Sequence, residues 1–243
     1  MSTSTVAVHV VIAVKGLADA KTRLARDFAP ADRRELVLAM FRDTLSAARA
    51  AEQVASVSVV TPDDAVAATA LTLGAAVFPE PAHADDTATG STRLNSAIGA
   101  TADRLRRGGA RHLLALQADL PAVTSAELSA VIAAAPIGTR SFVADHQTFG
   151  TAALLVRSGT LDLAPEFGIE SARRHLVSGA TALTGDWPGL RLDVDTTDDL
   201  ELAYRLGVGA HTRSRLAQVG WSPRHSPEVH RGIELTNCHP IRK

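Results

Sequence analysis

Short apolar runs alternate along the chain with segments of helical periodicity. Residues 6–14 are almost continuously apolar and β-branched, which is typical of a strand buried on both faces of a parallel sheet. Similar runs predict further strands at 54–60, 75–78, 112–117, 141–144, 151–156 and 190–194. Helical spacing or capping residues predict helices at 31–51, 65–73, 94–107, 124–134 and 197–206, and a short helix within 169–179. This alternation predicts an α/β fold with a mostly parallel central sheet.

The pattern divides the chain into one domain, residues 1–207, and a polar C-terminal tail, residues 208–243. The helical periodicity stops at Gly207, so we expect the tail to be ordered only where it docks on the body or on a partner. Residues 166–189 fit no simple strand–helix repeat, and we expect them to cover an edge of the sheet.

Composition narrows the class of protein. The 243 residues are 46% apolar and 21% charged, as in an ordinary globular protein, and the net charge is −1. That charge disfavours nucleic acid as a partner. No run approaches the roughly 20 apolar residues of a membrane span, and no basic segment precedes residues 6–14, so we expect a cytoplasmic protein without a membrane partner. The single cysteine excludes an intramolecular disulfide.

Several common catalytic signatures are missing. The sequence contains no GxxxxGK[ST], GxGxxG, HExxH or GxSxG motif. The sequence therefore lacks the signatures of a P-loop NTPase, a dinucleotide dehydrogenase, a zincin and a serine hydrolase.

Three cations follow the first predicted strand. Lys15, Lys21 and Arg23 lie within nine residues of one another, beside Gly16. Ligands of open α/β sheets bind just outside the carboxyl ends of strands. A nucleoside triphosphate brings about four negative charges, and such a cluster would neutralise them. The alternative is a solvated basic loop.

Carboxylates follow two other predicted strands. Asp119 comes just after the strand at 112–117, where it either holds Mg²⁺ against phosphates or caps the next turn. Alternation along the strand at 190–194 puts Asp193 and Asp195 on one face, as candidates to complete a metal site with Asp119.

A fourth set surrounds a predicted helix start. Gly168 and Ser171 lie at that start, His175 one turn later, and Thr151 follows a glycine earlier in the chain. Helix N-termini bind phosphate or carboxylate through free N–H groups. The alternative is an ordinary serine cap with a glycine turn.

Taken in order, the segments VKGLADAKTRL, ADLP, GT, FGIES and DVDTTDDL resemble the guanylyltransferases of coenzyme F420 biosynthesis, which act on 2-phospho-L-lactate or phosphoenolpyruvate. The resemblance covers residues 8–206. It implies a single-domain, GT-A-like, Rossmann-type nucleotidyltransferase fold, with GTP and a small phosphorylated acid as substrates and Mg²⁺ as cofactor.

The resemblance also implies roles for individual residues. Lys15 and Lys21 match phosphate-binding lysines, supported by Arg23, and Asp119 matches a metal ligand. Lys15, Lys21 and Asp119 are thus the expected catalytic residues. Asp195 matches the second metal ligand, although Asp193 is close enough to be that ligand instead.

The remaining matches concern the substrates. Thr151, Gly168 and Ser171 match positions that hold the acceptor, His175 matches the histidine after them, and Asn95 matches a residue near the nucleotide. The chain departs from the family's pattern twice: Ala152 replaces a frequent asparagine, and Arg93 replaces the usual glycine before Leu94-Asn95.

The expected reaction is transfer of GMP from GTP to the phosphate of phosphoenolpyruvate or 2-phospho-L-lactate, with release of pyrophosphate and transfer of the product to the next enzyme of the pathway. One alternative is a guanylyltransferase for another acceptor such as molybdopterin, although the loop KGLADAKTRL is shorter than the glycine-rich loop of that group. The other is a nucleotide-binding sensor without turnover, which has less need of three acidic residues.

Overall fold

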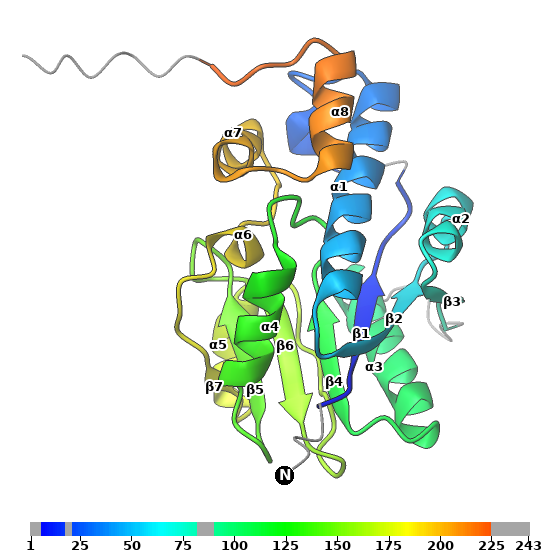
Figure 1. Cartoon of the computed structure of the whole chain (residues 1–243), viewed down its shortest axis with the longest axis vertical. Coiled ribbons are helices and arrows are strands. Elements are labelled where there is room, and N and C mark those ends of the chain that lie inside the picture. Colours follow the sequence, from blue (N-terminus) through cyan, green and yellow to red (C-terminus); the bar gives the residue numbers. More distant parts are fainter. Residues whose placement is uncertain (1–5, 18–20, 82–89, 225–243) are drawn as a thin grey trace, which may run out of the picture.

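The computed structural model describes residues 6–17, 21–81 and 90–224 (Figure 1). Within these residues, one sheet of seven strands has the order β3-β2-β1-β4-β6-β5-β7. The strands are β1 (Val8–Ala13), β2 (Val54–Val60), β3 (Ala76–Phe78), β4 (His112–Leu116), β5 (Arg140–Ala144), β6 (Thr151–Arg157) and β7 (Thr181–Ala182).

The prediction of a mostly parallel α/β sheet is confirmed. β1 pairs in parallel with both β2 and β4, β2 pairs in parallel with β3, and β5 with β7. Only β6 runs against its neighbours β4 and β5 in the described sheet. The carboxyl ends of β1 and β4 therefore meet at one edge, and the segments that follow them lie side by side.

The described helices are η1 (Thr22–Leu24), α1 (Pro30–Ala50), α2 (Asp64–Thr72), α3 (Gly90–Arg107), α4 (Ser125–Ala134), α5 (Ser171–Val177), α6 (Pro188–Arg191), α7 (Thr197–Leu206) and α8 (Ala210–Gln218). They cover both faces of the sheet, and an apolar core lies between the helices and the sheet on each face. Val10 and Ile12 of β1 belong to the core that α1, α4, α7 and α8 cover, whereas Val11 belongs to the core that α3 and α5 cover. β1 is therefore buried on both faces, as its apolar run predicts.

The prediction of a strand at 190–194 is wrong. Pro188 begins the short helix α6, and the chain after Arg191 is irregular until α7. Leu192 and Val194 are buried, so the alternation in the sequence reflects packing against the core and not a sheet ladder. The expectation that residues 166–189 cover an edge of the sheet is confirmed. This segment contains β7, which pairs with β5 and is the last strand in the sheet order.

The start of the predicted tail docks on the body. α8 lies alongside α1 (Figure 1), and Leu216 of α8 is buried in the core. Asp43 of α1 accepts hydrogen bonds from the backbone N–H groups of His211 (3.0 Å) and Thr212 (2.8 Å). The tail is thus packed over residues 208–224, and its remainder, 225–243, lies outside the described residues.

No helix in the described ranges combines the length and the apolar character that crossing a membrane requires.

The Asp43 contact generates a stability prediction. Replacing Asp43 by alanine leaves two N–H groups at the start of α8 without their acceptor, so we expect Asp43→Ala to lower the free energy of unfolding by about 1–3 kcal/mol. Urea denaturation measures this change. Glu35→Ala, at an exposed position of the same helix, is the matched control. Equal stability of the two variants would contradict the capping role.

Candidate active site

A cavity of about 740 Å³ lies where β1 and β4 end. Residues from several segments far apart in the sequence line it, among them Lys15, Lys21, Arg23, Asp119, Gly168, Asp193 and Asp195. The structure therefore brings together the cations after β1, the acid after β4 and both acids of the segment before α7. Thr151, Ser171, His175 and Asn95 are not among the residues that line this cavity.

Lys21 joins two of the acids. Its Nζ donates to Asp119 Oδ2 and to Asp195 Oδ1, the latter at 2.5 Å. Burial alone would lower the pKa of the Lys21 ammonium, but the two carboxylates outweigh burial and raise that pKa above its ordinary value. Lys21 is therefore charged and neutralises part of the acidic cluster.

Asp193 is the third acid of the cluster. Burial raises the pKa of its carboxyl, and the nearby charges of Asp119 and Asp195 raise it further, to about 7. The pKa of Asp195 is lowered, because the attraction of Lys21 outweighs the effect of burial. Like charges gathered in one cavity indicate a place where a cation binds.

The acids fit a hard divalent cation. Oδ1 of Asp119 is buried and has no hydrogen-bond partner among the described residues. Carboxylate oxygens are the ligands that Mg²⁺ prefers, and Mg²⁺ needs only one or two of them beside water and phosphate oxygens. No three acidic, histidine or cysteine side chains of the described ranges already converge on one metal position. Asp193 and Asp195 both line the cavity, so the geometry does not choose between them.

The loop after β1 is held by a residue that the sequence analysis missed. Asp63 accepts a hydrogen bond from Leu17 N–H (3.0 Å) and also caps α2 through Ala65 and Val66. These N–H groups together outweigh the effect of burial and lower the pKa of Asp63. The Thr61-Pro62-Asp63-Asp64 segment signals the start of a helix, but nothing in it signals the contact with Leu17.

Thr151, Ser171 and His175 form one buried hydrogen-bond chain. Ser171 Oγ donates to Thr151 Oγ1 (3.0 Å), and Thr151 Oγ1 lies 3.0 Å from His175 Nδ1. His175 Nε2 accepts from the backbone N–H of Glu166 (2.9 Å), so the ring proton is on Nδ1. This chain joins β6 and α5 and supports the segment that carries Gly168.

Gly168 and Asn95 fix the same segment from its other side. The amide of Asn95 donates to Phe167 O (3.0 Å) and accepts from Phe167 N–H (2.8 Å). Gly168 has φ 122°, and a Cβ there would come within 2.8 Å of Ser91 Cβ. Only glycine meets both conditions, so Asn95 and Gly168 set how closely this backbone approaches the cavity.

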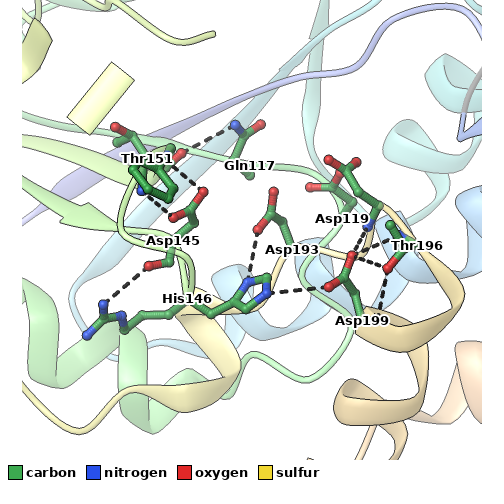
Figure 2. A network of polar contacts seen from close by, with 12 residues as sticks. Gln117, Asp119, Asp145, His146, Thr151, Asp193, Thr196 and Asp199 are labelled. Atoms are coloured by element: carbon green, nitrogen blue, oxygen red, sulfur yellow. Dashed lines mark hydrogen bonds and ion pairs between the residues drawn. The ribbon is translucent and has the colours of Figure 1, made fainter. Parts of the chain in front are cut away.

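His146 is a second residue that the sequence analysis missed. It lies in the turn between β5 and β6, and its ring lies between Asp193 and Asp199 (Figure 2). Its ring nitrogens are 3.7 Å from Asp193 Oδ1 and 3.4 Å from Asp199 Oδ1. No motif in the sequence signals this position, because the contact depends on how the irregular segment before α7 folds.

The buried state of His175 generates a pH prediction. Burial, and then the charges of Arg140 and Arg174, lower the pKa of His175 from 6.5 to about 4. Between these values the unfolded chain binds a proton that the folded protein does not, so the free energy of unfolding falls as the pH falls from 6.5 to 4. At about 1.4 kcal/mol per pK unit, this group accounts for a loss of up to ~3 kcal/mol.

Urea denaturation at several pH values checks this expectation. His175→Asn should show a shallower loss of stability over this range than the wild type, whereas His211→Ala, at an exposed histidine of α8, should keep the wild-type slope. If His175→Asn and the wild type lose stability in parallel, His175 is not the group responsible.

Comparison with known proteins finds relatives that match nearly the full length of the chain. The chain is 53% identical over 223 residues to the phosphoenolpyruvate guanylyltransferase of Nocardia farcinica (strain IFM 10152), covering 91% of this chain and 96% of that protein. It is 47% identical over 244 residues to the enzyme of the same name from Rhodococcus opacus (strain B4), covering 96% and 100%.

Solved structures show the same fold at low sequence identity. A protein of Desulfovibrio desulfuricans G20 superposes with a TM-score of 0.65 at 16% identity, covering 87% of this chain and 94% of that one. A nucleotidyl transferase from Methanothermobacter thermautotroptrophicus superposes with a TM-score of 0.53 at 18% identity, covering 82% and 97%. Residues 8–235 match the family described as guanylyl transferase CofC like, and the chain belongs to this family.

Proposed function

We propose that the protein transfers a guanylyl group from GTP to the phosphate of phosphoenolpyruvate and releases pyrophosphate, as a cytoplasmic step of coenzyme F420 biosynthesis. Two lines of support meet here. The chain belongs to a guanylyl transferase family, and near full-length relatives at about half identity carry the name phosphoenolpyruvate guanylyltransferase. Transfer of the product to the next enzyme of the pathway is part of the same proposal.

The observation that carries the chemistry is the meeting of Asp119, Asp195 and Lys21 at one cavity. A phosphate monoester is largely ionised near neutral pH, so the acceptor oxygen can attack the α-phosphorus of GTP without a general base. The bond from the α-phosphorus to the bridging oxygen breaks, and pyrophosphate leaves. Such a reaction depends on positioning and on neutralisation of charge.

The cations after β1 bind the triphosphate in this proposal. Lys15, Lys21 and Arg23 line the cavity beside Gly16, where backbone can approach a ligand closely. They hold the β- and γ-phosphates and stabilise the charge of the departing pyrophosphate.

Asp119, together with Asp195 or Asp193, would hold Mg²⁺. When bound, Mg²⁺ supplies orientation of the α-phosphate and charge neutralisation there. The unpartnered Oδ1 of Asp119 supports this assignment, as does the gathering of three acids in the cavity.

The acceptor is proposed to lie against Gly168. Thr151 and Ser171 lie in the buried hydrogen-bond chain just behind this glycine, where their hydroxyl groups support the segment that faces the acceptor. His175 orients Thr151, and Asn95 positions Phe167 and the glycine after it. On the described geometry, Gly168 touches the cavity directly, and the other four act from behind it.

An acceptor panel tests the proposed reaction. The protein with GTP and Mg²⁺ is incubated with phosphoenolpyruvate, 2-phospho-L-lactate, 3-phospho-D-glycerate or molybdopterin, and pyrophosphate release and product mass are measured. We expect release and a guanylylated product with phosphoenolpyruvate. Product from only another acid would reassign the acceptor, and tight GTP binding without pyrophosphate release would identify a nucleotide sensor.

The carboxylate after β4 generates a second prediction. Asp119→Asn keeps the size of the side chain but removes its charge, so we expect kcat to fall by roughly 10²–10³-fold while the protein stays folded. Asp198→Asn, at an exposed aspartate of α7, is the matched control and should retain wild-type turnover. Turnover of Asp119→Asn equal to that of the control would refute the assignment of Asp119 as a metal ligand.

A further inference from the structure

No regular secondary structure sets the direction of the Asp193 side chain. The segment from Leu192 to Thr196 is irregular, so no sheet ladder sets the direction of its side chains. The neighbouring residues are anchored: Val194 N–H donates to Asp119 O (3.1 Å), and Asp195 N–H donates to Asp199 Oδ2 (3.1 Å). These bonds hold the backbone on the carboxyl side of Asp193, and neither of them involves its side chain.

The other charged groups of the cavity do not hold the Asp193 side chain in place. Its side chain is only 23% exposed, and it shares the cavity with two other acids. Lys21 pairs with those two acids. Repulsion between like charges therefore disfavours a fixed position for the Asp193 carboxylate at the cavity unless another group holds it.

His146 faces Asp193 from the opposite side (Figure 2). Its Nδ1 is buried, has no hydrogen-bond partner among the described residues, and lies 3.7 Å from Asp193 Oδ1. Nε2, on the other side of the ring, lies 3.4 Å from Asp199 Oδ1. Asp199 Oδ2 caps α7 by accepting from Thr196 N–H (2.8 Å), so the imidazole bridges an acid of the cavity and the acid that anchors the next helix.

The position of His146 does not depend on its own side chain. Its backbone N–H donates to Arg191 O (2.7 Å). The turn that carries it is closed by Asp145, whose carboxylate accepts from Phe149 N–H (3.1 Å) and Gly150 N–H (2.8 Å). The imidazole can therefore be replaced while the turn stays in place.

We propose that His146 is a positioning residue for the metal site: its imidazole contacts Oδ1 of Asp193, which keeps that carboxylate in one orientation at the cavity, and ties it to Asp199 at the start of α7. This inference rests on the proposed function, because it gives Asp193 the role of a ligand to the divalent cation. Residues that orient metal ligands from behind commonly contribute 10–100-fold to metal affinity.

Titration of the protein with Mn²⁺, followed by the electron paramagnetic resonance signal of free Mn²⁺, tests the inference without turnover. We expect His146→Ala to bind Mn²⁺ about tenfold more weakly than the wild type. His146→Gln keeps a donor and should bind more tightly than His146→Ala. His211→Ala, at an exposed histidine, is the control and should match the wild type.

A double-mutant cycle with Asp193→Asn separates positioning from a general structural effect. If His146 acts through Asp193, adding His146→Ala to Asp193→Asn should weaken Mn²⁺ binding no further. An equal loss in both backgrounds overturns the inference. So does wild-type affinity in His146→Ala, a His146→Gln variant no better than alanine, or a wild-type protein that binds no Mn²⁺.

The acceptor panel reports on the proposed function separately. A wild type that makes guanylylated product while His146→Ala keeps full Mn²⁺ affinity refutes the role of His146 alone. A wild type that makes no guanylylated product with any acceptor refutes the proposed function, whatever the Mn²⁺ titration shows.

Discussion

One ammonium between two carboxylates holds this site together. Lys21 is separated from Asp119 by 98 residues of sequence and from Asp195 by 174, yet it donates to both. Without that charge, three acids would share one cavity with only Lys15 and Arg23 of the described lining to balance them. The same pairing brings the basic loop after β1 against the acidic segments, so the groups that would bind the triphosphate and the groups that would bind a cation face each other.

The sheet brings together the three segments that carry Lys21, Asp119 and Asp195. β1 and β4 are adjacent and parallel, so the segments after them emerge at the same edge. The backbone bond from Val194 to Asp119 O then fixes the third segment to the second. Because these contacts form from backbone groups of the folded core, the side chains are placed before any ligand arrives.

The sequence predicts the parts of this arrangement that follow from periodicity. The apolar runs locate β1, β2 and β4, and the general rule for open sheets places Lys15, Lys21 and Asp119 at one edge. The strand assigned to 190–194 is wrong because buried Leu192 and Val194 alternate with half-buried positions without pairing to a strand. Asp63 and His146 carry no local signal, since their roles come from contacts with loops distant in the sequence.

The carboxylate of Asp27 connects the turn after η1 to two later parts of the chain. One oxygen of its carboxylate accepts from Thr197 Oγ1 (2.5 Å), and the other lies 3.6 Å from Arg224 Nη2. The adjacent Phe28 stacks on Trp221, with ring centroids 6.5 Å apart. Asp27 thus joins the turn beyond η1 to the first residue of α7, and the last described stretch of the chain packs against that turn. A protein shortened to the end of α7 would keep every acid and every lysine of the cavity, and also the direct bond between Asp27 and Thr197, but that bond would lose the outer contacts that Arg224 and Trp221 make with Asp27 and Phe28.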